Sequence, residues 1–425
     1  MRVCVVGSGA REHALALALA RSAEVVVTPG NPAMAGTSPE GFAISVTDTA
    51  SEAVDAGLVV IGPEQPLVDG LADRLRAEGR LVLGPGADGA RLEGSKAFMK
   101  ELLSEARVPT ARHGVFDEAA PAKAFLRDLP GPWVVKTDGL AAGKGVFVTD
   151  SISEAEADIE AKLSGAAFGD AGRMVVVEEG LSGVECSLLA LCDGRNAVPL
   201  PLSQDFKRLE DGDDGPNTGG MGAYSPVPTV GHDMVDRVMD EIVEPTVAAL
   251  RRHGIDYRGV LYAGLMLTDD GPKVLEYNVR FGDPEAQVVL PRVDEDLTGL
   301  LAEAASGRLR TEPHPAPLAA VCVVLASPGY PTSPRTGEMI DGLERAAEVP
   351  GVTVLHAGTA FDRGRLVSAG GRVLSVVAVA DELSSARARA YEGVSHIDWP
   401  SMCFRRDIAA AAADSAMAVG SEGGR

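Results

Sequence analysis

The sequence predicts a multidomain protein of mixed α/β and α+β class, and three observations lead to this prediction. The chain has 425 residues, whereas a single hydrophobic core rarely grows beyond about 250 to 300 residues. Its first hundred residues alternate short apolar runs with helix-forming stretches, and glycine-rich turns follow the runs. Beyond residue 95 this pattern gives way to apolar segments that flank glycine-rich loops, which is typical of antiparallel strands.

The N-terminal part is expected to be a parallel, doubly wound sheet. A short apolar strand, Val3–Val6, is followed by an Ala- and Leu-rich helix over Glu12–Arg21. Three further apolar runs continue the alternation: Val25–Val27, Leu58–Ile61 and Leu81–Leu83. Because the carboxyl ends of parallel strands share one edge of a sheet, we expect the turns after them to line a ligand-binding edge.

The central part is expected to contain a hairpin, an antiparallel sheet and one long loop. Trp133–Lys136 and Val146–Val148 flank a glycine-rich stretch and indicate two antiparallel strands. Further strands are expected at 174–178, 186–192, 197–202, 259–267 and 272–278, and helices at 95–107, 154–163 and 234–252. The segment 203–228 is predicted to lack regular structure, and a loop of that length in a compact domain indicates a functional role.

A proline-rich linker, Leu309–Pro317, is expected to precede a small α+β domain. Strands are predicted over Ala319–Ala326, Thr353–Ala357 and Val373–Ala380, followed by a helix over 382–392. The last residues are expected to form a frayed tail.

Composition and charge narrow the class of function. Asp and Glu outnumber Lys and Arg by 61 to 39, a net charge of −22, which excludes a nonspecific nucleic-acid binder because such proteins need a basic face. Five cysteines without C-x-x-C spacing indicate free thiols rather than disulfides or a zinc site. We find no signal peptide and no apolar run long enough to span a bilayer, so we expect no membrane contact and a cytoplasmic protein.

The first glycine-rich turn, Gly7–Glu12, suits an anion better than a dinucleotide. Glu12 replaces the third glycine of a G-x-G-x-x-G motif, and Thr28 stands where a ribose-binding carboxylate is expected, which disfavours NAD. Gly9 and Arg11 remain at the start of a helix, where backbone N–H groups and a guanidinium favour a phosphate. The alternative is a tight turn that only lets the helix approach the strand.

A second glycine-rich stretch, Lys136–Val146, carries two lysines. It is not a Walker A loop, because Gly145 follows Lys144 where Ser or Thr is required and because the stretch leads into a strand. Its small residues still let the backbone approach phosphates closely. We interpret it as a phosphate-binding loop, and an exposed hairpin tip is the alternative.

Carboxylates near the ends of two strands indicate a magnesium site. Glu276 and Asn278 stand two residues apart in a strand, so their side chains share a face, and both offer the oxygen ligands that Mg²⁺ prefers. Arg280 follows at once, which favours an anionic substrate beside the metal. A weaker group, for which charged strand ends are an equally good explanation, is Glu178, Glu179 and Glu185.

The polar segment 203–228 holds a further group of candidate binding residues. Lys207, Arg208 and the glycine-rich run Asn217–Gly222 are suited to a phosphate, while Asp205 is suited to an amine. A disordered surface loop is disfavoured, because NTGGMGAYSP contains many residues with restricted backbone roles.

Together these runs resemble the ATP-grasp ligases and, more narrowly, the family of phosphoribosylamine–glycine ligases. The most specific matches are KTDGLAAGKGV and NTGGMGAYSP, and others extend from GSGAREHA through LEGSKAFMK, VEEGLSG, SQDFKR and EYNVRFGDPE to HAGT and GGRVL. The resemblance implies a pre-ATP-grasp domain over 1–100, ATP-grasp domains over 101–316 with a mobile lid at about 110–180, and a small α+β domain over 317–425.

The resemblance also implies an activity: ATP-dependent ligation of glycine to 5-phosphoribosylamine by a monomer or, alternatively, a dimer. Mg²⁺, or Mn²⁺ in its place, would be held by Glu276 and Asn278. Residues implied to bind ATP are Lys96, Lys136, Ala141, Ala142, Gly143, Glu178, Glu179, Leu181 and Glu185. Residues implied to bind the other substrates are Gly9, Arg11, Asp205, Lys207, Asn217, Thr218, Gly219, Gly220, Met221 and Arg280, and those implied in catalysis are Lys136, Asp205 and Arg280.

The sequence departs from the family pattern at two positions. Phe206 stands where the family usually has His, and we expect a packing role for it because Asp205 and Lys207 are retained. Ala10 stands where a glycine is common, which matters little if its φ is negative. Two alternative functions are another ATP-grasp ligase, acting on carbonate or formate, and a nucleotide sensor without turnover, which the presence of Lys136 and Glu276 disfavours.

Overall fold

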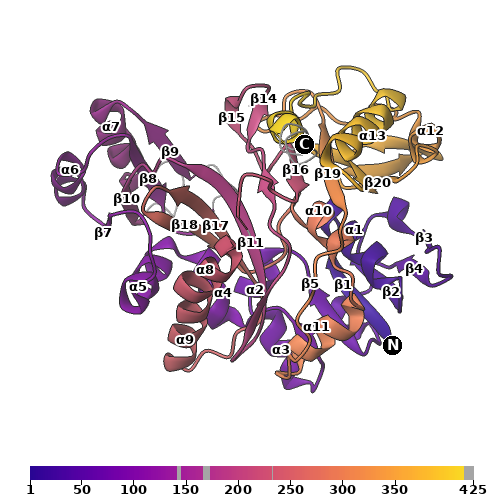
Figure 1. Cartoon of the computed structure of the whole chain (residues 1–425), viewed down its shortest axis with the longest axis horizontal. Coiled ribbons are helices and arrows are strands. Elements are labelled where there is room, and N and C mark those ends of the chain that lie inside the picture. The colour runs from indigo at the N-terminus through magenta and orange to yellow at the C-terminus, as the bar shows by residue number, and fades with distance from the viewer. Residues whose placement is uncertain (141–144, 166–172, 232, 416–425) are drawn as a thin grey trace, which may run out of the picture.

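The computed structural model describes residues 1–140, 145–165, 173–231 and 233–415. In Figure 1, the described residues between 113 and 179 form a lobe at the left, while the N-terminal part (indigo) and the C-terminal part (orange to yellow) lie one above the other at the right. Long central strands connect the two sides. Among the residues described, no helix is long and apolar enough to cross a membrane.

The N-terminal part is a six-stranded sheet in the order β3-β4-β2-β1-β5-β6. Its parallel strands are β1 (Arg2–Gly7), β2 (Glu24–Pro29), β4 (Ala43–Val46), β5 (Leu58–Ile61) and β6 (Val82–Leu83), and β3 (Gly36–Thr37) is antiparallel. Its helices are α1 (Ala10–Leu19), α2 (Glu64–Val68), α3 (Leu71–Ala77) and α4 (Ala87–Gly94). The predicted parallel sheet is confirmed, and β3 and β4 are additional to the strands that the sequence pattern indicated.

The lobe at the left of Figure 1 is a small antiparallel sheet with a core of its own. The sheet has the order β7 (His113–Phe116), β10 (Val175–Glu179), β8 (Trp133–Thr137) and β9 (Val146–Thr149). Helices α6 (Ala119–Arg127) and α7 (Ile152–Leu163) pack against each other and against the strands. The predicted hairpin is therefore confirmed as β8 and β9, whereas the role of this lobe as a lid stays a prediction.

The central sheet has the order β12 (Ala197–Pro199), β11 (Val184–Asp193), β17 (Arg258–Thr268) and β18 (Gly271–Asn278), all antiparallel. Helix α5 (Lys96–Ala106) packs against α9 (Glu244–Arg252) and β18. The helix predicted over 234–252 is present as α8 (Asp233–Val238) and α9, with one π-helical turn over Met239–Val243 between them.

The C-terminal sheet takes two of its five strands from the central part of the sequence. Its order is β13 (Gln204–Asp205), β16 (Gly222–Ser225), β19 (Ala319–Ala326), β23 (Arg372–Ala380) and β20 (Val352–His356). The prediction that 203–228 lacks regular structure is wrong, because this segment also forms a hairpin of β14 (Arg208–Glu210) and β15 (Asp214–Asn217). Such short strands carry no readable period of their own, and they form because β19 offers a buried edge to β16.

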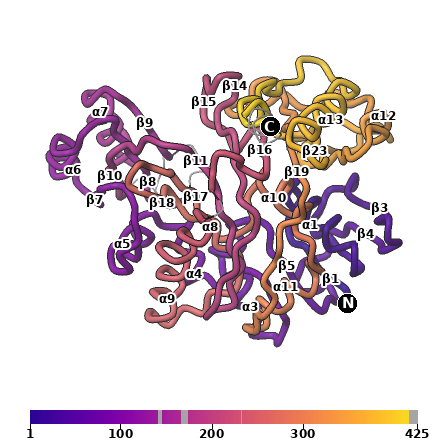
Figure 2. The backbone as a smooth tube through the Cα atoms, viewed as in Figure 1, coloured from indigo at the N-terminus to yellow at the C-terminus, as the bar shows by residue number. Residues whose placement is uncertain are grey.

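Helices and a second hairpin complete the C-terminal half. Helix α13 (Leu383–His396) covers β19 and β23 and contacts α12 (Leu343–Ala347), while β21 (Thr359–Asp362) and β22 (Arg365–Ser368) form the hairpin. The two α-helices directly before β19 are α10 (Ala286–Val289) and α11 (Leu297–Ala305). Figure 2 shows the chain rising from α11 past the N-terminal part to reach β19. All five cysteines are free, as expected.

A pair of stacked histidines joins α1 to β20, across the boundary between the N-terminal and C-terminal parts. The ring centroids of His13 and His356 are 5.7 Å apart, and His13 Nδ1 accepts the backbone N–H of His356 at 2.9 Å. Burial lowers the pKa of His13 to about 3 and that of His356 to about 4. Both rings are therefore neutral in the folded protein at pH 6.

Acid should weaken this contact, because the unfolded chain takes up protons at histidine near pH 6.5 and the folded chain does not. His13→Asn keeps a hydrogen-bond acceptor for His356 and removes one titrating group. Between pH 6 and 4 we expect the unfolding free energy of this variant to fall less steeply than that of the wild type, by up to about 1.4 kcal/mol per pH unit. Urea titrations across this range measure the difference, and parallel curves would contradict the assignment.

Candidate active site

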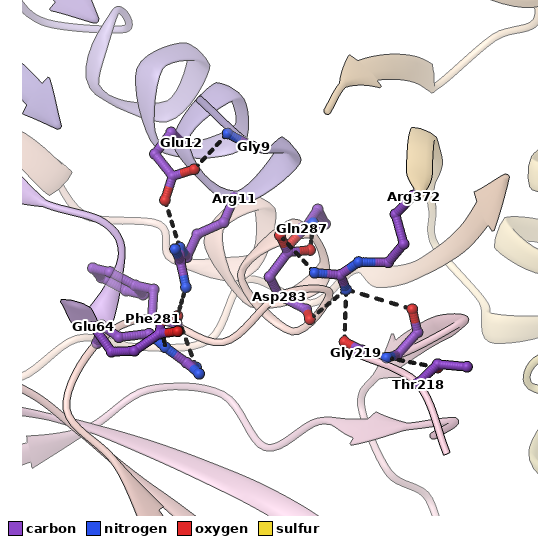
Figure 3. Close-up of polar contacts among 12 residues, drawn as sticks. Gly9, Arg11, Glu12, Glu64, Thr218, Gly219, Phe281, Asp283, Gln287 and Arg372 are labelled. Carbon is purple, nitrogen blue, oxygen red and sulfur yellow. Dashed lines mark hydrogen bonds and ion pairs between the residues drawn. The ribbon is translucent and has the colours of Figure 1, made fainter. Parts of the chain in front are cut away.

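The turn between β1 and α1 is built around the carboxylate of Glu12 (Figure 3). Gly9, the residue before α1, donates its N–H to Glu12 Oε2 at 2.7 Å. A Cβ on Gly62 would lie 2.1 Å from Glu12 Oε1, and one on Gly7 would lie 2.5 Å from the same side chain, so glycine at both positions leaves room for this carboxylate. The start of α1 thus accommodates a carboxylate of its own chain, which accounts for Glu12 in place of a third glycine.

Arg11 points toward the segment that follows β18 (Figure 3). Its Nε pairs with Glu12 Oε1 at 2.6 Å, and its Nη1 donates to the carbonyl oxygen of Phe281 at 3.2 Å. The side chain is buried, and these contacts hold α1 against the central part. Its predicted contact with a substrate phosphate stays a prediction.

A cavity of ≈ 260 Å³ lies beside this turn. Its walls come from all three parts of the chain and are formed by Ser8, Gly9, Ala10, Asp283, Ala357, Gly358, Arg372 and Ser375. Small-ligand pockets start at about 300 Å³, so its size is near that of a small metabolite site. The cavity depends on the packing of the C-terminal part against the N-terminal part.

Arg372 in β23 fastens two loops of the central part to the C-terminal sheet (Figure 3). Its Nη1 donates to the carbonyl oxygens of Gly219 at 2.6 Å and Asp283 at 2.8 Å, and its Nη2 lies 3.3 Å from Asp283 Oδ2. Burial acts to raise the pKa of Asp283, but Arg372 and Arg11 hold it below its usual value. Sequence reasoning did not select Arg372 or Asp283, although both stand in runs, GGRVL and RFGDPE, that carry the resemblance.

Hydrogen bonds to Lys207 and to Thr218 hold the glycine-rich run Asn217–Gly222 in place. Thr218 donates its N–H and its hydroxyl to the carbonyl oxygen of Lys207, both at 2.8 Å, and Gly220 donates to Thr218 Oγ1. A Cβ on Gly220 would lie 2.4 Å from Pro284, so this position requires glycine. Met221 is fully buried in the structure, whereas Asn217 is exposed in β15.

Lys207 lies between two carboxylates that the sequence analysis also selected. Its Nζ is 2.7 Å from Glu185 Oε2 and 3.4 Å from Asp205 Oδ1. Desolvation lowers the pKa of Lys207, but Asp205 and Glu185 outweigh it and raise the pKa well above its usual value. Close by, Tyr262 donates to Glu285 Oε1 at 2.9 Å, and burial raises the pKa of Glu285 to about 7.

Arg280 is fixed by two carboxylates of the N-terminal part. Its Nε lies 3.2 Å from Glu64 Oε2, and its Nη2 lies 2.9 Å from Glu93 Oε1 and 3.3 Å from Asn278 Oδ1. Glu93 also accepts the backbone N–H of Val279 at 2.8 Å. The guanidinium is therefore held rigidly at the end of β18, beside one of the two predicted metal ligands.

Lys136, in the small sheet, meets the strand that carries the predicted metal ligands. Its Nζ donates to the carbonyl oxygen of Leu275 at 3.0 Å and lies 3.0 Å from Glu178 Oε2. Lys96 donates to the carbonyl oxygen of Gly139 at 3.2 Å. Burial lowers the pKa of Lys96, Glu276 opposes this and Lys136 adds to it, so the three charges form one electrostatic group.

Glu276 and Asn278 are half-buried and alternate with the buried Tyr277 in β18, so they share a face as predicted. One carboxylate and one amide oxygen fit Mg²⁺, which usually takes one or two protein ligands and completes its shell with water and phosphate oxygens. Asn278 Oδ1 accepts from Arg280 and keeps a second lone pair. Their role as metal ligands stays a prediction.

The remaining predicted ATP contacts lie around β10 or outside the described residues. Glu178 is buried in β10, and Glu179 Oε1 accepts the N–H of Arg112 at 2.9 Å. Leu181 follows in the connection to β11 and is half-buried. Ala141, Ala142 and Gly143 lie outside the described residues.

Phe206 has the packing role that was expected. Its ring centroid lies 6.1 Å from that of Tyr224, and the guanidinium carbon of Arg405 lies 4.7 Å above the ring. The residue packs against the core of the C-terminal part, while Asp205 and Lys207 on either side reach the candidate site.

Comparisons with known proteins agree with this architecture. The phosphoribosylglycinamide synthetase models match the chain in three pieces: the N domain over residues 1–93, the ATP-grasp (A) domain over 94–286 and the C domain over 320–411. A phosphoribosylamine–glycine ligase from Brucella melitensis is 47% identical over 423 residues, covering 96% of this chain and 97% of that protein. One from Streptomyces coelicolor is 48% identical, covering 97% of this chain and 100% of that protein.

Solved structures give the same answer. The crystal structure of phosphoribosylamine–glycine ligase from Thermotoga maritima aligns with a TM-score of 0.83 at 36% identity, covering 96% of this chain and 100% of that chain. A biotin carboxylase domain from Hydrogenobacter thermophilus, solved with MgADP, aligns with a TM-score of 0.70 at 16% identity, which shows the shared fold alone. The chain belongs to the phosphoribosylglycinamide synthetase family of ATP-grasp enzymes.

Proposed function

We propose that this protein is an ATP-dependent carbon–nitrogen ligase that joins glycine to 5-phosphoribosylamine and releases ADP and phosphate, a step in purine synthesis. The observation that supports the proposal most directly is the contact between Lys136 and β18. Its Nζ touches the carbonyl oxygen of Leu275, so a cation suited to ATP phosphates lies next to Glu276. That placement suits phosphoryl transfer, in which the protein mainly positions groups and neutralises charge.

The proposed reaction has two steps. An oxygen of the glycine carboxylate attacks the γ-phosphorus of ATP, and the bond from that phosphorus to the bridging oxygen of ADP breaks, which gives glycyl phosphate. The amine of phosphoribosylamine then attacks the acyl carbon, the carbon–oxygen bond to phosphate breaks, and the nitrogen loses a proton. Mg²⁺, when bound, would neutralise phosphate charge and orient the transferred group.

Residues of the chain would divide these tasks. Lys96, at the start of α5, and Lys136, in β8 of the small sheet, would both bind the phosphates of ATP. Asp205 would accept hydrogen bonds from the amine of a substrate. Arg280, which Glu64 and Glu93 hold rigidly, would face the carboxylate of glycine or its phosphorylated form.

Glycyl phosphate would hydrolyse if water reached it, so closure over the site is expected. The small sheet, formed by β7 to β10 with α6 and α7, has its own core and contributes Lys136. We propose that this lobe closes over ATP. We also expect Mn²⁺ to replace Mg²⁺, and the enzyme to act in the cytoplasm as a monomer, with a dimer as the alternative.

A direct assay tests the proposal. Purified protein is mixed with Mg²⁺, ATP, glycine and freshly prepared 5-phosphoribosylamine, and ADP release and the amide product are followed. We expect ADP release only when both co-substrates are present. Turnover with formate or bicarbonate in place of glycine would favour another ATP-grasp ligase, and ATP binding without turnover would favour a sensor.

A further inference from the structure

A fully buried lysine, Lys100, shares the carboxylate of Glu178 with Lys136. It belongs to α5, one helical turn after Lys96, and its side chain is 0% exposed. Its Nζ lies 3.0 Å from Glu178 Oε1 and donates to Thr110 Oγ1 at 2.7 Å. Thr110 in turn donates to the carbonyl oxygen of Val274 in β18 at 2.7 Å. Lys100 therefore lies where α5, the small sheet and the central sheet meet.

Glu178 is shared between two lysines. Its Oε1 faces Lys100, and its Oε2 lies 3.0 Å from the Nζ of Lys136. Burial acts to raise the pKa of Glu178, but Lys136 and Lys100 hold it below its usual value. One carboxylate between two ammonium groups leaves one net positive charge. Of the two lysines, Lys136 lies next to β18 and therefore presents this charge to the candidate ATP site.

Stability alone accounts poorly for a charge at position 100. Buried ion pairs contribute little net stability, and apolar side chains of similar volume often replace them without loss. Like charges four residues apart on a helix, as in Lys96 and Lys100, are also unfavourable. Burial lowers the pKa of Lys100 to about 8, so desolvation of this ammonium group is substantial. The presence of lysine here needs an explanation that involves charge.

We propose that Lys100 is a positioning residue for ATP: by sharing Glu178, it keeps the charge of Lys136 from being cancelled, so that Lys136 attracts the phosphates. The inference rests on the proposed function in one respect, the contact of Lys136 with phosphate. Without Lys100, Glu178 and Lys136 form a neutral pair that has little attraction for an anion. Without the charge of Glu178, nothing cancels the charge of Lys136. The pKa of Lys100 then falls further, because Glu178 is the group that opposes its desolvation, so Lys100 adds little charge of its own.

The two substitutions therefore differ in their effect on the preference for phosphates. Titration calorimetry with Mg²⁺ present measures affinity for ADP and for adenosine, and the ratio of the two affinities isolates the phosphates from the base and ribose. Lys100→Met should lower this ratio about tenfold, whereas Glu178→Gln should not lower it, because Lys136 keeps its charge in that variant. The double variant should return to within about threefold of the wild type, because the remaining Lys136 then faces a neutral Gln.

Lys123→Met serves as the matched control. Lys123 pairs with Glu160 on the outside of the small sheet, so this variant removes the same charge far from the joint and should leave the ratio unchanged. Equal loss of ADP and adenosine affinity in Lys100→Met, no loss, or no recovery in the double variant would each overturn the proposal. If Lys100→Met does not fold, Glu178→Gln decides, because a fall in its ratio contradicts the proposed charge balance.

The binding test and the activity assay can refute the two proposals separately. ADP binding does not require glycine or phosphoribosylamine, so a wild type that binds ADP and lacks glycine-dependent turnover would refute the proposed function and leave the role of Lys100 open to the same measurement. Conversely, a full ligase activity with an unchanged ADP-to-adenosine ratio in Lys100→Met would refute only the inference about Lys100.

Discussion

Replacing Glu276 with alanine should lower kcat by about 10³-fold and leave the fold intact. Glu276 is half-buried in β18, and its carboxylate is the charged member of the predicted metal pair. Metal stabilisation of phosphoryl transfer amounts to several kcal/mol, and each 1.36 kcal/mol changes a rate tenfold. The loss of activity is measured as ADP release at saturating ATP, glycine and phosphoribosylamine, over a series of Mg²⁺ concentrations.

Asp270→Ala is the matched control for this experiment. Asp270 is a largely exposed carboxylate in the turn between β17 and β18, so its removal changes the net charge equally on the same hairpin. We expect near wild-type turnover from it and unfolding midpoints within a degree or two for both variants, about the effect of a surface substitution. Mg²⁺-dependent activity that survives in Glu276→Ala would show that the metal is held elsewhere.

Arg280→Met should lower the free energy of unfolding by about 3 to 5 kcal/mol, the usual effect of removing one partner from a buried ion pair. Arg280 is 15% exposed and Glu93 is 9% exposed, and the substitution leaves that carboxylate and Glu64 facing each other without a cation. Urea denaturation measures the loss. Arg237→Met is the control, because Arg237 in α8 pairs with Glu241 in the following π-helical turn, where both side chains are exposed. This substitution should change stability by no more than about 0.5 kcal/mol.

The variant should also change how stability depends on pH. Burial raises the pKa of Glu93 even in the native protein, where Arg280 opposes the shift. Without Arg280 the raised pKa means that the folded state binds a proton more tightly than the unfolded state, so stability is lost as pH rises and is partly regained toward pH 5. Adding Glu93→Gln should restore much of the loss at pH 8. A loss equal to that of Arg237→Met would refute the role of this pair.

Much of the fold could be predicted because its strands carry their own signal. The runs Leu58–Ile61 and Ala319–Ala326 are fully buried and uniformly apolar, so the approximate position of each strand follows from the sequence. The segment 203–228 could not be predicted in this way. Its strands are two to four residues long, and pairs such as Gly222 with Val323 join positions about a hundred residues apart.

The same distinction separates the site residues that were found from those that were missed. Lys136 and Glu276 stand in runs whose residue types and spacing suggest phosphate and metal chemistry. Lys100 looks like an ordinary helix residue until the fold brings Glu178, 78 positions later, to its Nζ, and Arg372 acquires its role only by meeting Gly219. Contacts of this kind are set by the packing of whole elements, and no local pattern records them.

The C-terminal sheet combines strands from two distant parts of the chain, which limits the exchange of domains between relatives. β16 lies between β13 and β19, so the segment that carries Lys207 and the glycine-rich run is anchored in the C-terminal sheet. About 90 residues of chain separate β16 from β19. A chimera that exchanged only the residues after the proline-rich linker would leave β16 facing a foreign strand and the β19 edge without its native partner. An exchange between relatives would have to carry residues 204–225 along, so the two segments are expected to have diverged together.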